Sequence, residues 1–454
     1  MRPHLSLLGS AFPSILALLL PATGGSAQAQ DPTFQLLYTF QQVGGTPVSI
    51  MEASPGNFLG VTGTSPLVFA VSSAGSYKAL YNFPISASPF PMVSALNGKI
   101  YGSALSSGGT SLAELFWVDP KGAVNTLQYN GATQGGPSYL VESPDSHLYT
   151  FFGTIPGSPA LFSRLGSDGQ PVTLYSFPAG QGVPWTPPFL GHDGNFYGLA
   201  SIGNGASVSV FRITPAGSFS WVIQGVATGK YGLAYIPDLI LASNGKFYGT
   251  LPQGGSANAG IMYEVSMDGT YHNVYEFSQP NTGIPETLLE ASDGMIYVTT
   301  RGFFEQGQGY SSVLRFNPST GKVTTMYEFT NAANGECECR FIQASDGKLY
   351  GVTANAGTYQ LGTIFSLDLG LPKPAPKISY IGPSSGSAGD TILLFGSSLF
   401  STSAVSFNGT PATTFEVASS QGVWANVPVG ATTGPITLTT PAGTTTTAEI
   451  FTVQ

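Results

Sequence analysis

The sequence ASDGKLYGVT, from Ala344 to Thr353, contains the pattern that decides the fold of most of this chain. A small polar Asp-Gly turn precedes an aromatic-Gly pair, which begins a short apolar run. Asp or Asn before Gly is typical of tight hairpin turns, because both residues accept positive φ. Seven copies of the pattern occur, and the other six are Ser54–Thr62, Ala95–Ser103, Ser143–Phe151, Gly191–Leu199, Ala242–Thr250 and Ala291–Thr299. The pattern therefore predicts a repeated β-hairpin.

The spacing of the copies identifies the architecture. The second aromatic position falls at Leu59, Tyr101, Tyr149, Tyr197, Tyr248, Tyr297 and Tyr350, with spacings of 42, 48, 48, 51, 49 and 53 residues. Repeats of roughly 40–50 residues built from short strands are typical of β-propeller blades, each a four-stranded sheet. The sequence therefore predicts seven blades.

Two further columns, meaning sets of equivalent residues in successive copies, recur with the same spacing along the chain. One is the apolar-aromatic pair of VFRITPAG (Val210–Gly217), and the other is an L-Y-x-F motif that begins at Leu37–Phe40. If each blade ends with the L-Y-x-F strand, the last blade lacks its outer strand and Leu37–Phe40 is left over. Pairing the two would remove an open sheet edge. We predict that Leu37–Phe40 lies antiparallel beside Ile364–Leu367 and closes a seven-bladed β-propeller over residues 31–370.

The composition favours an all-β fold. Charged residues make up only 9% of the 454 residues, whereas Gly (59) and Pro (34) are abundant and 12% of residues are aromatic. Such a chain packs through apolar and aromatic contacts and through turns, and no helical periodicity of ten residues follows the N-terminal segment. The net charge of −9 argues against a surface that tracks phosphates, so we expect no nucleic-acid partner.

The N-terminus has the features of an export signal. Arg2 supplies a positive start, Ile15–Leu20 lies in an apolar core, and Ala27-Gln28-Ala29 forms a small-x-small cleavage site. The apolar core is too short to span a bilayer. We therefore expect residues 1–29 to be a signal peptide, with no membrane span after its removal and a secreted or periplasmic location.

The C-terminal part predicts a second domain. The Pro-rich stretch LPKPAPK, residues 371–377, has the composition of a semi-rigid linker. Residues 378–454 contain fewer aromatics and more Thr, Ser and Val, with strand-like alternation in VSFNG and PITLTT. That pattern predicts a small β-sandwich.

The same segment resembles an IPT/TIG domain, the immunoglobulin-like module of many surface and extracellular proteins. The matching residues are Pro383, Gly386, Gly389, Gly396, Phe407-Asn408-Gly409, Val427-Pro428 and Gly434. The resemblance implies an immunoglobulin-like β-sandwich for residues 378–454.

The repeats themselves resemble a bacterial extracellular tandem-repeat family called GloVer, whose repeats read roughly D-G-N-L-Y-G-T-T followed by G-T-V-F-K-L-T-P-x-G. The fifth and seventh copies fit this pattern, whereas the first and third depart at Phe58-Leu59-Gly60 and Tyr149-Thr150. The resemblance implies a secreted repeat protein and brings no catalytic residues with it.

No catalytic or metal-binding pattern stands out. His147 and His192 lie in or beside equivalent turns of different blades, and we interpret them as turn residues; the third histidine beyond the N-terminal segment is His272. A His-Glu-x-x-His helix, a nucleophile elbow and a calcium loop are all missing from the sequence. The Asp-Gly carboxylates have the same turn interpretation: Asp193, Asp293 and Asp346. We expect no metal and no cofactor, and we assign no catalytic residue.

One column of residues before the turns is partly acidic. It reads Glu52, Ser94, Glu142, Leu190, Leu241, Glu290 and Gln343. Its position on the expected inner strand makes Glu52, Glu142, Glu290 and Gln343 candidates for lining a central channel. Carboxylates about 5–10 Å apart can hydrolyse a glycoside. Because the column is apolar in two blades and neutral in two more, a polar channel lining is the favoured interpretation.

Tryptophan and cysteine supply the remaining candidates. Trp185, flanked by prolines in an expected loop, suits stacking on a sugar or burial against a partner, although a structural loop role is favoured. We expect the other tryptophans, Trp117, Trp221 and Trp424, to be packed within strands. Cys337 and Cys339 lie two residues apart; a local disulfide or no bond is favoured over a soft-metal dithiol.

Two functional hypotheses follow. The favoured one is a non-catalytic binding or scaffold protein that recognises a carbohydrate or a cell-surface protein through loops on one rim of the propeller. The alternative is a secreted polysaccharide hydrolase or lyase with its site at the channel mouth. The shortage of His, Lys and Arg favours the first hypothesis.

Overall fold

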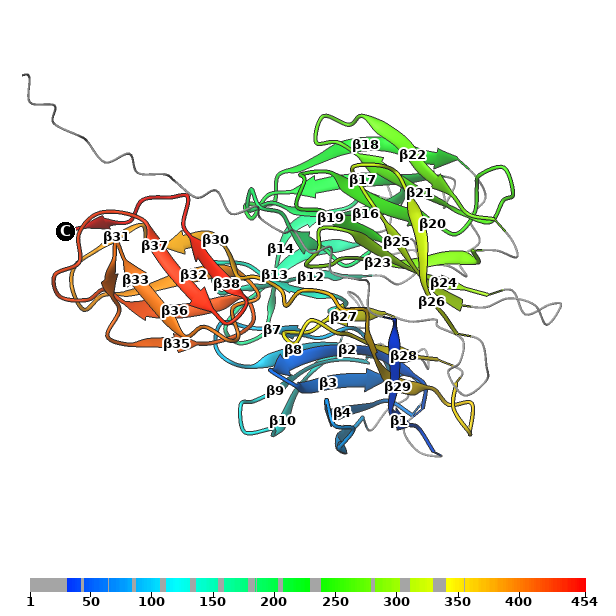
Figure 1. The fold of residues 1–454 in the computed structure, drawn as a ribbon, viewed down its shortest axis with the longest axis horizontal. Coiled ribbons are helices and arrows are strands. Elements are labelled where there is room, and N and C mark those ends of the chain that lie inside the picture. Colours follow the sequence, from blue (N-terminus) through cyan, green and yellow to red (C-terminus); the bar gives the residue numbers. More distant parts are fainter. Residues whose placement is uncertain are drawn as a thin grey trace, which may run out of the picture.

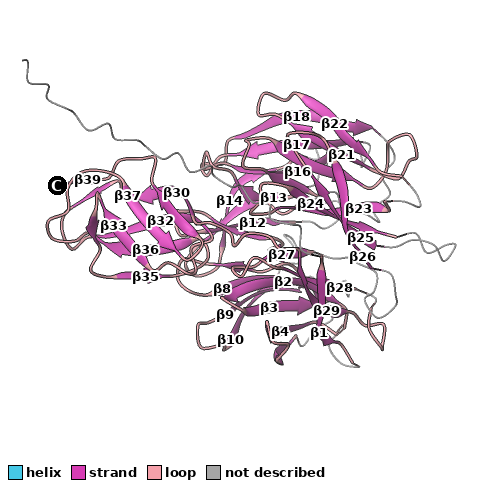
Figure 2. Cartoon of the chain, viewed as in Figure 1, coloured by secondary structure: helices cyan, strands magenta, loops and turns pink. Residues whose placement is uncertain are grey.

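The computed structural model describes residues 31–454 except 42–44, 64, 84–86, 107–111, 131–135, 154–158, 179–183, 185, 203–206, 229–237, 279–281, 303–310, 330–339 and 355. The described part is all-β and contains no helix (Figure 2). It accordingly contains no helix with the length and apolar character needed to cross a bilayer.

Residues 33–368 form antiparallel sheets that follow one another along the chain (Figure 1). We number them sheets 1–7. Sheet 1 contains β2 (Pro47–Ser54), β3 (Asn57–Thr62), β4 (Leu67–Ser72) and β5 (Tyr77–Asn82). Sheet 2 contains β6 (Ala87–Pro89), β7 (Val93–Ser94), β8 (Ile100–Ser106), β9 (Leu112–Val118) and β10 (Val124–Asn130). Sheet 3 contains β11 (Leu140–Glu142), β12 (Leu148–Phe152), β13 (Leu161–Leu165) and β14 (Pro171–Ser176). Sheet 4 contains β15 (Phe189–Leu190), β16 (Phe196–Ile202), β17 (Ser207–Ile213) and β18 (Phe219–Thr228).

The remaining three sheets of this region repeat the same strand order. Sheet 5 contains β19 (Leu239–Leu241), β20 (Phe247–Leu251), β21 (Ile261–Val265) and β22 (Tyr271–Glu276). Sheet 6 contains β23 (Ile284–Glu290), β24 (Ile296–Arg301), β25 (Ser311–Phe316) and β26 (Val323–Phe329). Sheet 7 contains β27 (Phe341–Gln343), β28 (Leu349–Thr353), β29 (Thr363–Asp368) and β1 (Thr33–Thr39). These sheets resemble propeller blades.

The first strand of the chain completes the last sheet. β1 pairs antiparallel with β29, with Leu36 opposite Phe365 and Tyr38 opposite Ile364. In Figure 1 the dark blue β1 lies beside the gold β29. The predicted antiparallel pairing of the first strand with the last is therefore confirmed, and the edge of β29 is covered. The register differs from the expectation, because Ile364–Leu367 faces Phe34–Tyr38 and the L-Y-x-F motif reaches beyond Ile364 to Thr363 and Gly362.

Each sheet packs against the next one. Separate apolar clusters lie between sheets 1 and 2, 2 and 3, 3 and 4, 4 and 5, 5 and 6, and 6 and 7. A further cluster joins sheet 7 to sheet 1 and includes Leu37, Phe69 and Tyr350. No sheet could bury both faces alone, so the repeats stabilise one another.

The aromatic-Gly pair has a steric cause. In sheet 7, Gly351 lies opposite Phe365, and a Cβ atom on Gly351 would come within 2.6 Å of that ring. The same pairing joins Gly60 to Phe69, Gly102 to Phe116, Gly198 to Phe211 and Gly249 to Tyr263. Where the glycine is replaced, the aromatic ring is replaced too: Thr150 faces Ser163 and Val298 faces Leu314. The glycine column and the aromatic column of the repeat are therefore the two sides of one cross-strand contact.

The turn role of the Asp-Gly pairs is also confirmed. In sheet 6, Gly294 donates to the carbonyl of Ala291, and its φ of 73° lies in the left-handed region. The conformation differs from the expectation that both turn residues have positive φ. Only the glycine does, while the Asp293 side chain accepts from the backbone N–H of Met295 and from the Tyr297 hydroxyl. Six of the seven turns have glycine at this place, and the third has Ser146 at φ 62°.

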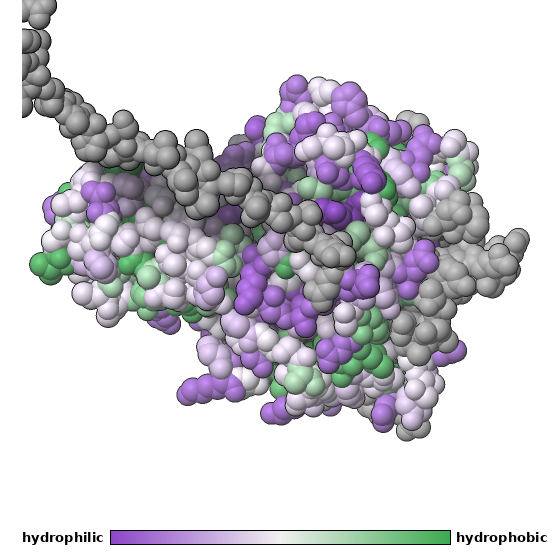
Figure 3. All heavy atoms as spheres, in the orientation of Figure 1, coloured by the Kyte–Doolittle hydropathy of each residue, from purple (hydrophilic) through white to green (hydrophobic). Residues whose placement is uncertain are grey.

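The C-terminal region consists of two sheets around one core. One contains β30 (Lys377–Gly382), β32 (Thr391–Ser397), β36 (Gly422–Asn426) and β35 (Phe415–Val417). The other contains β34 (Thr410–Pro411), β33 (Ala404–Phe407), β37 (Ile436–Thr440) and β38 (Gly443–Thr446). A short parallel pair joins β31 (Ser385–Gly386) to β39 (Thr452–Val453). Their surface is mostly of near-neutral hydropathy on the face in Figure 3, as expected for a segment rich in Ser and Thr.

The C-terminal sheets dock on sheets 2 and 4. Leu96 of sheet 2 packs with Leu393 and Phe395, and its carbonyl accepts a hydrogen bond from the Trp424 indole at 3.2 Å. Leu190 of sheet 4 joins the same cluster. The Ser94 and Ser420 hydroxyls are 3.3 Å apart. The contact fixes the C-terminal sheets beside one rim of the repeat region.

Candidate functional site

Four of the five polar residues in the column before the turns form hydrogen bonds to the preceding sheet. Glu52 accepts from the backbone N–H and the hydroxyl of Ser345, both at 2.8 Å, and so joins sheet 1 to sheet 7. Glu142 accepts from the N–H of Leu96, Glu290 from that of Ser243, and Gln343 from that of Ser292. Each acceptor therefore binds the turn of the preceding sheet. Their predicted place along a channel stays a prediction.

This role accounts for two of the three exceptions in the column. Leu190 would face Pro144 by the same spacing, and proline has no N–H to donate. Ser94 is instead directed to Ser420 of the C-terminal sheets. For Leu241 we find no structural reason.

Glu142 has the most unusual environment of the four. Its side chain is 3% exposed, and both carboxylate oxygens lie 2.8 Å from the N–H of Leu96. Burial raises the pKa of Glu142 to about 8, the hydrogen bond from Leu96 opposes that rise, and the charge of Asp145 adds to it. The carboxyl is therefore mostly protonated at neutral pH.

Several sequence candidates lie outside the described residues. They are Trp185, Cys337, Cys339 and the expected signal peptide. His147, His192 and His272 belong to three different sheets, the first two in turns and the third on β22. Within the described ranges, no group of three or more His, Cys, Asp and Glu side chains could hold a metal ion.

In each sheet, one residue on the neighbouring strand lies opposite the repeated tyrosine position. At this place one sheet differs from all the others. Tyr149, Tyr197 and Tyr297 each face an arginine, namely Arg164, Arg212 and Arg315. In sheets 1, 5 and 7 this position holds Ala70, Glu264 and Ser366. In sheet 2 it holds Trp117, opposite Tyr101. One sheet therefore has a large aromatic side chain where three sheets have an arginine.

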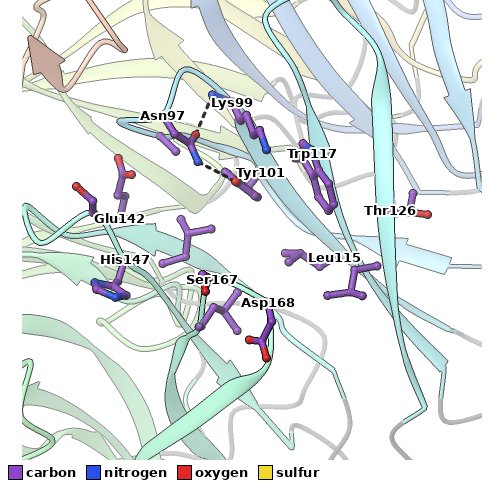
Figure 4. Close-up of a pocket in the computed structure, with 17 residues that line it drawn as sticks. Asn97, Lys99, Tyr101, Leu115, Trp117, Thr126, Glu142, His147, Ser167 and Asp168 are labelled. Atoms are coloured by element: carbon purple, nitrogen blue, oxygen red, sulfur yellow. Dashed lines mark hydrogen bonds between the residues drawn. The ribbon is translucent and has the colours of Figure 1, made fainter. Parts of the chain in front are cut away.

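Trp117 lines a groove between sheets 2 and 3, with a volume of about 460 Å³ (Figure 4). One wall comes from sheet 2 and contains Asn97, Lys99, Tyr101 and Trp117. The Asn97 amide donates to the Tyr101 hydroxyl at 2.9 Å, and the Lys99 ammonium lies 5.2 Å from the centre of the Trp117 ring. The half-buried indole is thus held by its neighbours.

Sheet 3 forms the other wall. Its turns contribute His147, Ser167 and Asp168, which Figure 4 shows opposite Lys99 and Trp117. Asp168 is exposed, and one of its oxygens accepts from the N–H of Gln170 at 3.0 Å. The buried Glu142 also lines the groove. The two walls combine an aromatic surface with a cation, a carboxylate, an amide and an imidazole.

A glycine keeps the groove open at its outer end. Gly169 has a φ of 77°, and a Cβ atom there would lie 2.4 Å from Leu127. Its carbonyl accepts a hydrogen bond from the Tyr129 hydroxyl of sheet 2. The two walls are therefore tied together next to the groove.

A different group of ionisable residues comes from sheets 3, 5 and 7. Tyr139, Asp238 and Arg340 each immediately precede the first strand of their sheet. Burial raises the pKa of both Tyr139 and Asp238, and the charge of Arg340 opposes both shifts. The Asp238 carboxylate also accepts from the N–H of Leu288 at 2.8 Å. Residues about a hundred positions apart are thus within electrostatic reach.

Neither group was identified from the sequence. Trp117 was expected to be packed within its strand, yet it lines the groove. The signal was present, because Trp117 occupies a repeated position at which related copies carry Arg212 or Arg315. Tyr139, Asp238 and Arg340 also occupy one equivalent position of the repeat. The residue type at that position differs from copy to copy, however, so it forms no recognisable column.

The sequence matches a known repeat. A sequence model described as the Gloeobacter/Verrucomicrobia repeat matches residues 186–381. This chain is therefore a repeat protein. The match ends before most of the C-terminal sheets and leaves the IPT/TIG resemblance a prediction. No curated protein matches this sequence.

Several solved structures share the fold at low sequence identity. A streptogramin B lyase is 16% identical, with 75% of this chain and 98% of that chain covered and a TM-score of 0.53. Virginiamycin B lyase from Staphylococcus aureus is 13% identical, with 74% and 98% covered and a TM-score of 0.52. A copper-bound fungal alcohol oxidase of the AA5 family is 12% identical, with 94% and 99% covered and a TM-score of 0.53. At these identities the likeness concerns the fold alone.

Proposed function

We propose that this protein is an exported, non-catalytic binding protein that recognises a carbohydrate through the groove between sheets 2 and 3. The observation that carries the proposal is Trp117, an aromatic side chain at a position where three other sheets have arginine. A local departure from the rules of a repeat is expected where function requires it. The export signal read from residues 1–29 supplies the proposed secreted or periplasmic location.

The composition of the groove suits a sugar. Aromatic rings offer a flat apolar surface for the C–H face of a pyranose, and ligand sites generally combine such surfaces with a few placed polar groups. Asn97, Lys99 and Asp168 supply donors and acceptors for hydroxyl groups around the Trp117 ring. The volume of about 460 Å³ lies within the usual range for small-ligand sites.

The proposal includes the finer architecture. The sheets form one closed seven-bladed β-propeller, and an immunoglobulin-like sandwich of the IPT/TIG type follows it. Support for closure comes from the β1–β29 pairing, from the apolar cluster between sheets 7 and 1, and from the bond between Glu52 and Ser345. Support for the second domain comes from its two four-stranded sheets and shared core.

The test is a glycan-array screen of the protein that starts at Asp31, followed by titration calorimetry with the strongest carbohydrate. Trp117→Ala should weaken binding at least about tenfold, because removing an aromatic anchor typically costs more than 1 kcal/mol. Trp117→Phe should retain part of the affinity. Arg212→Ala, at the same repeat position in sheet 4, is the matched control and should bind like the parent protein.

Two outcomes would contradict the proposal. One is equal loss of affinity in Trp117→Ala and Arg212→Ala, which would indicate a general effect on the fold. The other is the absence of binding to any carbohydrate on the array.

A second candidate function has its own observation. Tyr139, Asp238 and Arg340 come from alternate sheets and influence one another's pKa, and such clusters of perturbed ionisable groups are common at enzyme sites, here that of a hydrolase or lyase. Incubation of the protein with polysaccharides tests it. Release of reducing or unsaturated sugar ends would favour this enzyme over the binding protein.

A further inference from the structure

A second groove lies on the other side of sheet 2. It is formed between sheets 1 and 2, has a volume of about 560 Å³, and is lined by Leu59, Ala70 and Leu80 together with Asn57 and Lys78. From sheet 2 it is bordered by Ile100 and by the turn that contains Asp119. Its floor is apolar, and its polar residues lie at the edge.

The two grooves are equivalent positions of the repeat. Leu59 and Ala70 face each other in sheet 1 as Tyr101 and Trp117 do in sheet 2. In sheets 3, 4 and 6 the same pair is a tyrosine and an arginine. The small Ala70 leaves space where those sheets place a long side chain.

Both grooves open on the same rim. The first includes Asn97 and His147 and the second includes Asn57 and Gly98, all in or beside the turn that precedes the aromatic-Gly strand of a sheet. They flank opposite faces of sheet 2. Sheets pack face to face at about 10 Å, so the groove centres are separated by at least about that distance.

We propose that the groove between sheets 1 and 2 is a second subsite of the same carbohydrate-binding rim, so that the protein binds an extended polysaccharide chain rather than a single sugar. This inference rests on the proposed function. The occupant is a further sugar unit of the chain held at Trp117. Its apolar face lies on Leu59, Ala70 and Leu80, while its hydroxyls meet Asn57 and Lys78.

The test uses oligosaccharides of increasing length, cut from the polymer that the array identifies. The parent protein should bind long oligomers about tenfold or more tightly than the shortest one that binds, because a linked second contact adds an intramolecular binding event. Ala70→Arg places in the second groove the residue that sheets 3, 4 and 6 have there. It should abolish the gain with length and leave the shortest oligomer unaffected. Arg212→Ala, at the same position in sheet 4, is the matched control and should keep the gain.

A second variant guards against misfolding. Lys78→Glu changes an exposed side chain at the edge of the second groove and should reduce the gain with length even if Ala70→Arg does not fold. An unchanged gain in Ala70→Arg and Lys78→Glu would overturn the second subsite and leave the groove at Trp117 intact. Failure of the parent protein to bind any length would overturn both.

Discussion

Trp117 and Glu142 meet in one groove, but they enter it for different reasons. Trp117 replaces a charged member of a repeated cross-strand pair, whereas Glu142 occupies its usual place in the column that binds the preceding turn. Only the burial of Glu142 is unusual. The chemistry of the groove therefore arises from one replaced residue and one unusually buried residue on an otherwise regular scaffold.

The raised pKa of Glu142 predicts a pH-dependent stability. Its pKa is about 8 in the folded protein, against 4.5 for an exposed glutamate. Between these values the folded state holds a proton that the unfolded state has released. The free energy of unfolding should therefore fall as pH rises through this range, by at most about 1.4 kcal/mol per pH unit from this group. Below pH 4.5 and above pH 8 the contribution is constant.

Glu142→Gln imitates the protonated side chain and tests this account. Urea denaturation from pH 4 to pH 9 should show a variant whose stability relative to the parent protein is constant below about pH 4.5 and then increases up to about pH 8. Glu290→Gln, at the same repeat position in sheet 6, is the matched control. Parallel stability curves for Glu142→Gln and the parent protein would show that Glu142 titrates normally.

At the residue scale, the sequence identified the acidic column but not its partners. Glu52 and Ser345 are separated by 293 residues, and no local pattern indicates that a side chain will bind the turn of a neighbouring repeat. Pro144, which would face Leu190, is visible in the sequence. Its significance depends on the hydrogen bond that other sheets form at this position, for which a proline has no N–H. Asp193 and its equivalents were predictable as turn residues because the preference of Asp-Gly is local.

At the scale of elements, the hairpins follow from the sequence and the interruptions do not. The order of strands in each sheet agrees with the order of the three columns. The first strand of sheet 2, however, is split into β6 and β7 around Pro91, which cannot donate to a ladder. That split was not predicted, because a proline near a strand end is common.

The pairing of Gly351 with Phe365 predicts a measurable coupling. Gly351→Ala should lower the free energy of unfolding by about 1–3 kcal/mol, because its Cβ would overlap the Phe365 ring. Phe365→Leu alone should also destabilise, through loss of aromatic packing.

The double variant should be more stable than the sum of the single effects, by at least about 0.5 kcal/mol, since it approaches the natural Val298–Leu314 pair of sheet 6. Denaturant titrations of all four proteins measure this coupling. Strict additivity would mean that the glycine is not there to accommodate the ring.

At the scale of the whole molecule, the phase of the repeat predicted which distant strands meet. β1 and β29 pair because the first outer-strand motif precedes the first complete copy of the repeat. The docking of the C-terminal sheets was not predictable in this way. It depends on the contact between Leu96 and Trp424, which joins one copy of the repeat to a segment outside the repeats, and on the small residues Ser94 and Ser420.

Removal of β1 should open the repeat region. A chain that starts at Gln41 loses the stacking of Tyr38 on Tyr77, at 3.8 Å between ring centres, and leaves the edge of β29 unpaired. We expect a loss of stability of more than about 3 kcal/mol and self-association through that edge. Light scattering and denaturation measure both effects. A chain that starts at Thr33 retains β1 and is the control; a monomeric and equally stable shorter chain would exclude a structural role for β1.

In the proposed function, a single replacement in a repeated column creates a carbohydrate site. The most direct measurement is the ratio of dissociation constants of Trp117→Ala and Arg212→Ala for the same oligosaccharide, because the two substitutions alter equivalent positions of sheets 2 and 4. A ratio of about ten or more, with both variants folded, is the predicted result. A ratio near one would contradict the claim.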